Sequence, residues 1–342
     1  MDTTNTNGNG QPLRTLMQAV KYFADLNVAH DYFAKMRWPD GPICPHCGSK
    51  DVSYSAKYRR FECKHRHDRR QFTVKTGTVM EDSPLGLDKW ASAFWLEVNA
   101  KNSISSYEIH RALGITQKSA WFMLHRIRLA IKSKSFDKIG GNGQIVEADE
   151  TSIGGLAINM YKAKRKARIT GRGNVGKAIV MGLLERKGRK APISQINTYV
   201  LPNIQRDTMR DIIHSEVAAG TEMHTDAYQV YRTLGPDFVH KFIDHAETYV
   251  RDNVHTNGLE NFWSLFKRCI KGTHISVDPF HLTAYLDSET FRFNYRDLKD
   301  GERFRLALKG MSGKRLTYKA LIGVLEGAPG ADKDAQSGNL PN

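Results

Sequence analysis

Beyond residue 140 the chain orders short β-type runs and amphipathic helical runs in a way that limits the folds open to it. Three β-rich runs come first, at 144–149, 177–184 and 195–201. A helical run near 204–217, strand-type runs at 222–225 and 238–243, and helical runs beginning at 257 and 281 follow. Strands that precede alternating strands and helices indicate a mixed α/β sheet covered by helices.

The N-terminal part of the chain has a different character, and a glycine-rich joint, IGGNGQ at 139–144, ends it. Helical spacing covers 12–35 and 85–99, and 103–132 has the pattern of two short helices broken at Gly114. We therefore predict a tail at 1–11, a helix plus a small ribbon at 12–82, a helical region at 83–140, an α/β domain at 141–326 and a second tail at 327–342.

Three of the four cysteines lie close together in the sequence, which is typical of a metal site. Cys44 and Cys47 form a Cys-Pro-His-Cys-Gly knuckle, and Cys63 follows in the segment FECKHRH at 61–67. With one histidine, these thiolates make a Cys3His set for one structural Zn²⁺, without which so small and polar a ribbon would not fold. Reduced surface thiols without metal are the alternative. Cys269 is distant, and we expect it to be a buried small hydrophobe.

Two histidines compete for the fourth zinc position. His67 leaves three residues between itself and Cys63, whereas His65 leaves one. A longer turn lets the imidazole reach back to the metal, so we favour His67.

The pair of short helices at 103–132 has the pattern of a helix-turn-helix. Ser105 and Glu108 form a capping box, and Gly114 closes the first helix. The second helix places apolar residues on one face, and we expect basic residues of its other faces to contact DNA: Lys118, Arg126 and Arg128. A structural helix pair without contact to DNA is the alternative.

Acidic residues end two of the predicted strands. Asp149 ends the first strand, two residues after Glu147 on the same face, and Asp226 ends the strand that begins at Glu222. The helix from 257 adds Glu260, with Lys267 two turns later, so an acid and a cation share a neighbouring face.

Three converging carboxylates repel one another unless divalent cations neutralise them. Hard oxygen ligands suit Mg²⁺ or Mn²⁺, and two such ions activate a water or a 3′ hydroxyl and stabilise the leaving oxygen of a phosphodiester. We therefore expect Asp149, Asp226 and Glu260 to bind two Mg²⁺ (or Mn²⁺) ions and catalyse phosphoryl transfer. For any one of these acids, a helix cap or a solvated turn is the alternative.

Composition favours a polyanionic partner. Lys and Arg number 51 against 36 Asp and Glu, a net charge of +15. The segment 159–177 holds seven Lys or Arg and no acid, and we expect it to clamp DNA through Lys162, Lys164, Arg165, Lys166 and Arg168. A solvated loop is the alternative. No run of about 18 apolar residues and no signal peptide occur, so we expect a cytoplasmic protein without a membrane span.

The order of several motifs resembles the zinc-ribbon branch of bacterial insertion-sequence DDE transposases. The motifs are CPHCGS, TGTVMEDSPLGLDKW at 76–90, VEADETSIGG at 146–155, HTDAY at 224–228, HTNGLENFWSLFKRCIKG at 255–272 and FRFNYR at 291–296. The resemblance covers nearly the whole chain apart from the tails. It implies a ribonuclease-H-like catalytic fold, bound Mg²⁺, and the cutting and rejoining of DNA at inverted repeats.

The resemblance also implies roles for single residues. Asp149 matches the first acid of the triad, Asp226 the second and Glu260 the third. Lys267 matches the basic residue that contacts DNA near the cut, and we expect Arg268 beside it to bind DNA as well.

The roles of three further positions do not follow directly from the family pattern. Some relatives carry Asn at the third acid position, so Asn257 is a candidate helper. Arg66 stands where a fourth cysteine is usual, and Glu147 has no assigned role.

Together these features predict an insertion-sequence transposase that acts on the double-stranded DNA of element ends and targets. It would work as a homodimer or a larger assembly and associate with the bacterial nucleoid when bound. A regulator that binds DNA without catalysis and a nuclease that hydrolyses without rejoining are the alternatives.

Overall fold

The computed structural model describes residues 13–132, 138–154, 177–188, 192–226, 231, 236–243 and 254–324. The chain forms two compact units, each assembled from separate stretches of sequence. The first unit contains Met1–Asn99, Ser105–Ile131 and Lys299–Asn342, and the second contains Ala100–Ile104 and Lys132–Leu298.

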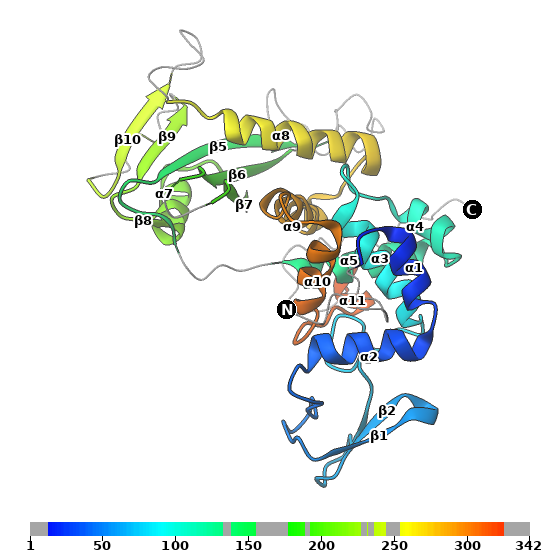
Figure 1. Ribbon diagram of the computed structural model, residues 1–342. Helices are drawn as coiled ribbons and strands as arrows, with labels where there is room; N and C mark the ends of the chain where they lie inside the picture. Colours follow the sequence, from blue (N-terminus) through cyan, green and yellow to red (C-terminus); the bar gives the residue numbers. More distant parts are fainter. Residues whose placement is uncertain are drawn as a thin grey trace. The chain divides into compact units, whose positions relative to one another are not determined.

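Helices build most of the first unit (Figure 1). The helical run predicted at 12–35 is two helices, because Asp25 interrupts it and accepts hydrogen bonds from the backbone N–H groups of Asn27 and Val28 as an N-cap. The helices of this unit are α1 (Leu16–Phe23), α2 (Leu26–Arg37), α3 (Leu87–Asn99), α4 (Ser106–Leu113), α5 (Gln117–Ile131), α10 (Asp300–Lys309) and α11 (Tyr318–Leu321).

Aromatic side chains from distant parts of the sequence meet in the core of this unit. Phe304 of α10 lies 5.7 Å from Phe23 of α1 and 5.4 Å from Trp95 of α3, between ring centroids. All three are buried. The C-terminal helix α10 thus completes a core that the N-terminal helices begin.

The predicted ribbon is a three-stranded antiparallel sheet within this unit. Its strands are β1 (Val52–Ser55), β2 (Arg60–Cys63) and β3 (Gln71–Phe72), in the order β1-β2-β3. Val52 pairs with Cys63, and Phe61 pairs with Phe72. A 3-10 turn, η2 (Ala56–Tyr58), joins the first two strands.

The helix pair forms as the capping signals predict. Ser105 accepts from the backbone N–H of Glu108 at 3.2 Å, and the Glu108 carboxylate accepts from the N–H of Ser105 at 2.7 Å. Gly114 ends α4 in the left-handed conformation (φ 59°), which glycine adopts without steric cost. Helix α5 begins three residues later and packs on α4.

A five-stranded mixed sheet organises the second unit, with the order β10-β9-β5-β6-β7. The first three strands in sequence are antiparallel neighbours, whereas β9 is parallel to both β5 and β10. The strands are β5 (Ile145–Ile153), β6 (Ala178–Glu185), β7 (Gln195–Leu201), β9 (Glu222–Asp226) and β10 (Val239–Ile243). A separate two-stranded sheet pairs β4 (Ile139–Gly140) with β8 (Val217–Ala218).

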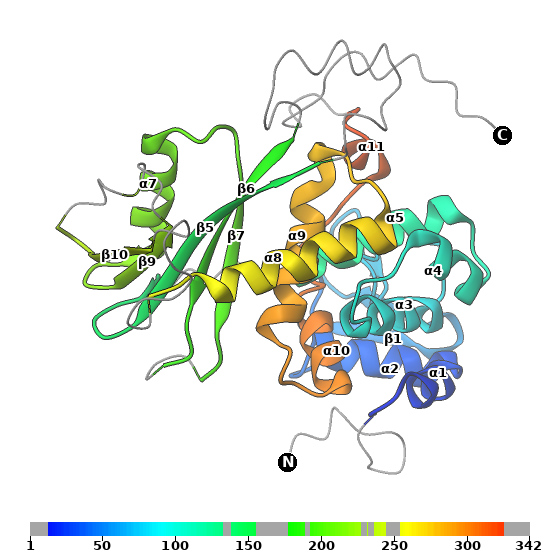
Figure 2. The same ribbon diagram turned by 90° about the horizontal axis from the view of Figure 1, so that it is seen from above.

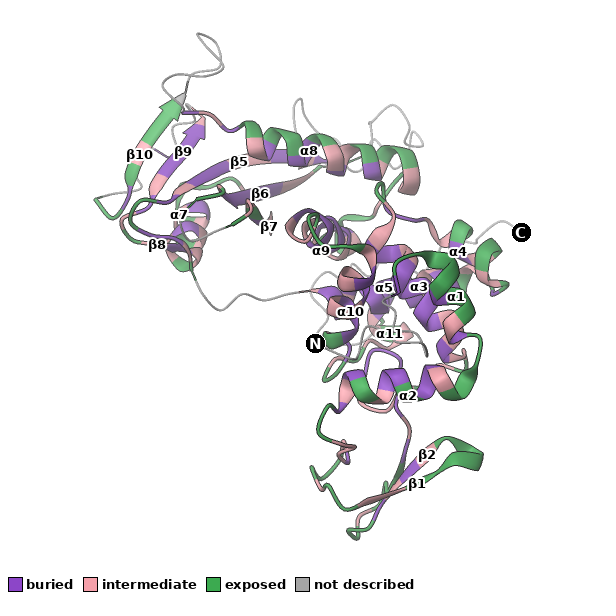
Figure 3. Ribbon diagram, in the orientation of Figure 1, coloured by how far each residue is buried: buried purple, intermediate pink, exposed green. Residues whose placement is uncertain are grey.

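Helices cover both faces of the large sheet, as the order of elements predicts (Figure 2). Helix α7 (Arg206–Glu216) packs on one face, around Val146, Ala148 and Met223. On the other face, α8 (Asn257–Cys269) and α9 (Leu282–Asn294) bury Leu259, Phe262, Trp263 and Phe266. Figure 3 shows the central strands β5 and β9 largely buried and the edge strand β10 largely exposed. The predicted mixed α/β sheet is therefore confirmed.

The compact units differ from the predicted domain limits at the C-terminal side. The sequence predicts an α/β domain that runs to 326, but the second unit ends at Leu298. Helices α10 and α11 belong instead to the first unit, because buried Phe304, Leu308 and Met311 fill its core. Among the described residues, none of the helices combines the length and the apolar character needed to cross a bilayer.

Candidate zinc site and candidate active site

The ribbon gathers three sulfurs and one imidazole. The ligand atoms of Cys44, Cys47, Cys63 and His67 all lie within 4.8 Å of one another. The Cys44 sulfur is 3.5 Å from His67 Nε2, and the Cys47 sulfur is 3.6 Å from that of Cys63. Three thiols and an imidazole are the donor set of structural zinc. The structure places His67 in this set, and His65 is exposed outside it.

The knuckle that carries the first two cysteines is a tight turn. The Gly48 N–H donates to the Cys44 carbonyl at 2.9 Å, and the Cys44 N–H donates to the Ser49 carbonyl at 2.9 Å. Gly48 has φ +74°, a conformation that a residue with a Cβ adopts only with strain. The glycine therefore lets the chain fold back so that both thiols point to one side.

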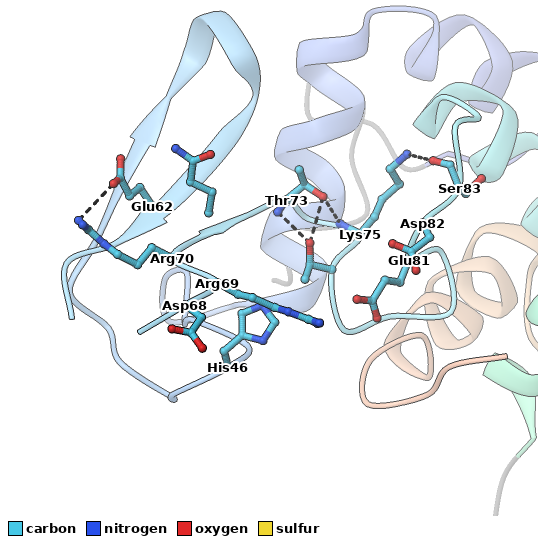
Figure 4. Close-up of a pocket in the computed structure, with 12 residues that line it drawn as sticks. His46, Glu62, Asp68, Arg69, Arg70, Thr73, Lys75, Glu81, Asp82 and Ser83 are labelled. Atoms are coloured by element: carbon cyan, nitrogen blue, oxygen red, sulfur yellow. Dashed lines mark hydrogen bonds and ion pairs between the residues drawn. The ribbon is translucent and has the colours of Figure 1, made fainter. Parts of the chain in front are cut away.

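A polar cavity of about 690 Å³ lies between the ribbon and the segment 73–83 (Figure 4). Lys75 faces it, but its ammonium donates to the carbonyls of Ser83 and Leu85. Arg70 pairs with Glu62 at 3.2 Å. Glu81 and Asp82 line the opposite side, so charges of both signs alternate around this cavity. That mixture argues against a dedicated anion site.

The second unit sets the two predicted strand-end aspartates on neighbouring strands. Asp226 ends β9 as predicted, but β5 continues to Ile153, so the prediction that Asp149 ends its strand is wrong. The parallel pairing of β5 with β9 sets Ala148 opposite Thr225, so Asp149 and Asp226 follow as neighbours on one face. The side chains are both partly exposed. The face is that of α8, because the Trp263 indole N–H donates to the Asp149 carboxylate at 3.1 Å.

Gly182 of β6 explains how α8 comes so near. It lies opposite Asp149 in the antiparallel pairing of β5 and β6. A Cβ at this glycine would fall 2.6 Å from a Leu259 methyl and 2.8 Å from the Trp263 ring. The absent side chain thus lets Trp263 reach Asp149, and it brings the exposed Glu260 of the same helix to this end of the sheet.

The protonation of Asp149 reflects the nearness of the other two acids. Burial, followed by the charge of Asp226 and, more weakly, that of Glu260, raises the pKa of Asp149 from 3.8 to about 6. A carboxylate whose charged form is disfavoured by two neighbouring acids fits a site for a divalent cation. Within the described residues, however, only the cysteine–histidine set packs its ligand atoms within 4.8 Å of one another, so the three acids are looser neighbours.

Sequence reasoning missed a hydrogen-bonded pair, Glu150 and Tyr231, next to these acids. Tyr231 is fully buried, and its hydroxyl donates to the Glu150 carboxyl. Burial, together with the charges of Asp149 and Asp226, raises the pKa of Glu150 to about 8. Glu150 directly follows the predicted acid, but no spacing signal separates it from a solvated turn residue.

Glu147, which had no role in the sequence analysis, is an anchor. It is 1% exposed and accepts from Arg186 Nε at 2.6 Å and from the backbone N–H of Leu259 at 3.0 Å. The predicted shared face of Glu147 and Asp149 is therefore that of α8. Arg186 drew no attention in the sequence, because a single arginine after a strand has no distinguishing pattern.

The basic stripe predicted on α5 needs correction. Arg128 is 1% exposed and pairs with the buried Glu97 at 2.9 Å. Arg126 is buried too and donates to the carbonyls of Leu316 and Glu81. The expectation that these two arginines contact DNA is wrong, because both stabilise the interior of the first unit. Lys118 is exposed near the start of the helix.

The remaining predicted DNA contacts divide between two regions. On α8, Lys267 is partly exposed and Arg268 is exposed, and Asn257 is exposed at the start of the helix. The basic segment with Lys162, Lys164, Arg165, Lys166 and Arg168 lies outside the described residues. Cys269 is buried, as predicted.

Comparison with known families defines the class of protein as a transposase. Residues 140–294 match the model of the ISXO2-like transposase domain, and residues 27–68 match that of the transposase zinc-ribbon domain. The chain thus carries an ISXO2-like transposase domain and a transposase zinc-ribbon domain, and the resemblance drawn from its motifs is confirmed.

Two relatives carry related names. The chain is 26% identical, over 79% of its length and 91% of the relative's, to a protein in the transposable element ISH50 of Halobacterium salinarum. It is also similar to a transposase-like protein of Haemophilus influenzae, with 29% identity over 31% of this chain and 85% of that one. The family and these relatives identify a DNA-processing enzyme.

Proposed function

We propose that the chain is the DNA transposase of an insertion sequence, which binds the terminal inverted repeats and catalyses Mg²⁺-dependent strand cleavage and strand transfer. The observation that carries the proposal is the pairing of β5 with β9. It sets Asp149 beside Asp226 on the sheet face that α8 covers, and α8 carries Glu260. The strand order, three antiparallel strands followed by two parallel ones, supports a ribonuclease-H-like fold.

The side chains at this site have distinct proposed roles in metal binding and DNA binding. The carboxylates of Asp149, Asp226 and Glu260 would hold two magnesium ions. When bound, the ions supply charge that activates a water or a 3′ hydroxyl and stabilises the leaving oxygen. The Trp263 indole N–H orients the Asp149 carboxylate. Lys267, two turns after Glu260 on α8, binds the DNA backbone near the scissile phosphate, with Arg268 beside it.

The first unit supplies DNA recognition in this proposal. The ribbon and the α4–α5 pair, a helix-turn-helix in this interpretation, bind the element ends, with Lys118 exposed on α5. The basic segment at 159–177 clamps the backbone. Because transposition joins two ends, a homodimer or a larger assembly provides the two active sites, and the working location is the bacterial nucleoid in the cytoplasm.

Incubation of the protein with Mg²⁺ and duplexes that carry the element's own ends tests the proposal. We expect cleaved and joined products, and an Asp226→Asn variant that binds the same duplex without cutting it. Binding without cleavage by the unaltered chain would favour a regulator, and cleavage without joining of pre-cut ends would favour a nuclease. Cleavage that survives in Asp226→Asn would contradict the assignment of the acids.

A further inference from the structure

An ionic network around the buried Glu147 anchors the first turn of α8, close to Glu260 in the sequence. Arg186 Nε donates to Glu147 at 2.6 Å, and Arg186 Nη2 donates to the carbonyl of His255 at 2.6 Å and to its Nδ1 at 2.7 Å. One arginine therefore ties strand β5 to the residues that lead into the helix.

The same carboxylate takes the place of a helix cap. The Thr256 side chain, at the N-cap position, does not cap α8. Instead the Glu147 Oε2 atom accepts from the Leu259 N–H at 3.0 Å, and His255 Nδ1 accepts from the Asn257 N–H at 3.3 Å. These bonds satisfy N–H groups that the first helical turn leaves without intrahelical partners. A negative charge also interacts favourably with the N-terminal end of a helix.

Gly258 makes the close approach possible. A Cβ at this position would lie 2.8 Å from Glu147 Oε2 and 3.1 Å from Oε1. The carboxylate therefore sits against the bare backbone of the first turn, and any larger residue would push the two apart.

His255 is held in one protonation form. Its Nδ1 accepts two hydrogen bonds, from Arg186 and from the Asn257 backbone, so the network assigns the proton to Nε2. Burial and the adjacent Arg186 charge lower the pKa of His255, which agrees with a neutral ring. The arginine can then hold this ring and the Glu147 carboxylate at once.

We propose that Glu147, oriented by Arg186, is a positioning residue that fixes the first turn of α8 and thereby the place of Glu260 beside Asp149 and Asp226. The inference rests on the proposed function, since Glu260 matters only if the three acids catalyse. This role explains why an acid, Glu147, stands two residues before Asp149. Strand β5 carries one catalytic carboxylate, and through Glu147 it also fixes the helix that carries another.

Two variants separate positioning from general stability. Glu147→Gln removes the negative charge that faces Arg186. The double variant Glu147→Met with Arg186→Met replaces the buried pair with apolar side chains, which in other proteins is neutral or stabilising. Its thermal stability should match that of the unaltered chain, but the Leu259 N–H and the His255 carbonyl lose these partners. Glu97→Gln is the matched control, since Glu97 also pairs with an arginine, the fully buried Arg128, in the first unit.

Hydrogen exchange followed by mass spectrometry on peptides covering 255–263 measures the anchor without any metal or DNA. We expect exchange there to quicken on the order of ten- to a hundredfold in both Glu147 variants, as for the loss of a buried hydrogen bond to a charged group. The Glu97→Gln chain should exchange at the normal rate in this segment. Cleavage of end-bearing duplexes should fall at least tenfold in both Glu147 variants, with DNA affinity unchanged.

Unchanged exchange at 255–263, or cleavage at the normal rate in the double variant, would overturn the positioning role while leaving the proposed function intact. Absence of cleavage by the unaltered chain would instead refute the proposed function. The exchange comparison would still decide whether Glu147 fixes the start of α8.

Discussion

At the scale of single residues, the surroundings of Asp149 change the pKa of its carboxyl group. Its carboxylate accepts the Trp263 indole N–H, which favours the charged form, yet burial and the neighbouring acids Asp226 and Glu260 outweigh this bond. The result is a pKa of about 6, well above that of an ordinary aspartate. A fold tolerates such a cost where a cation or a reaction uses the charge.

The replacement Asp149→Asn should stabilise the second unit in magnesium-free buffer at pH 8. Asp149 binds its proton more tightly in the folded than in the unfolded chain, so its charge lowers stability as pH rises from about 4 to about 6, and the penalty persists above. Because the side chain is partly exposed, we expect a gain of about 1–2 kcal/mol.

Calorimetry at a series of pH values measures this gain, which should shrink toward zero as the pH falls to 4. Asp297→Asn, at an exposed position of the same unit, is the control and should change little. An equal gain at pH 4 and pH 8 would show that removal of the charge is not the cause.

At the scale of elements, the ribbon depends on ligand spacing more than on packing. Its strands are short, and two of the four proposed ligands, Cys44 and Cys63, are buried. The turn after β2 returns His67 to the sulfurs, while the neighbouring His65 is exposed and is not part of the set. Metal binding and folding of such a module are coupled.

A pair of single replacements tests this coupling. His67→Ala should lower the zinc content below one per chain and quicken proteolysis of the ribbon, because a tetrahedral ion loses a ligand. His65→Ala should retain one zinc per chain. Metal analysis of both purified chains gives the answer, and zinc loss on His65→Ala alone would reverse the ligand assignment.

At the scale of the whole molecule, neither compact unit is continuous in sequence. The first unit starts with α1 and is completed by α10, which begins only at Asp300, after the whole of the second unit. Phe304, Leu308 and Met311 are fully buried there. The Asn99 side chain also donates to the Asp300 carbonyl at 3.2 Å, within the same unit.

Truncation after Leu298 should therefore unfold the N-terminal unit, although the deleted residues are the last in the chain. Removal of a phenylalanine from a core costs about 3–5 kcal/mol, and this deletion removes several buried side chains. Truncation after Val324 keeps every described contact and serves as the control.

Calorimetry and DNA binding would measure the effect. We expect the first truncated chain to lose one unfolding transition and its affinity for duplex DNA. A first unit that melts normally without α10 would contradict this assignment.

The sequence by itself determined the local features of this protein. Hydrophobic periodicity predicted β7 at its observed bounds and most other elements, and capping residues located α4. Cysteine spacing identified the ribbon, and the acids that close β-type runs marked Asp149 and Asp226, although Asp149 lies inside β5 in the structure. Such features are readable because periodicity, caps and knuckles act between residues a few positions apart.

Only the tertiary structure decided which charges face inward. Arg126 and Arg128 have the same sequence signature as surface arginines, but the packing of the first unit buries them against carbonyls and Glu97. The anchoring role of Glu147 depends on Arg186 and Leu259, which are 39 and 112 positions away. Burial and pairing across such separations are set by how elements pack, and a pattern that acts within a few residues cannot encode them.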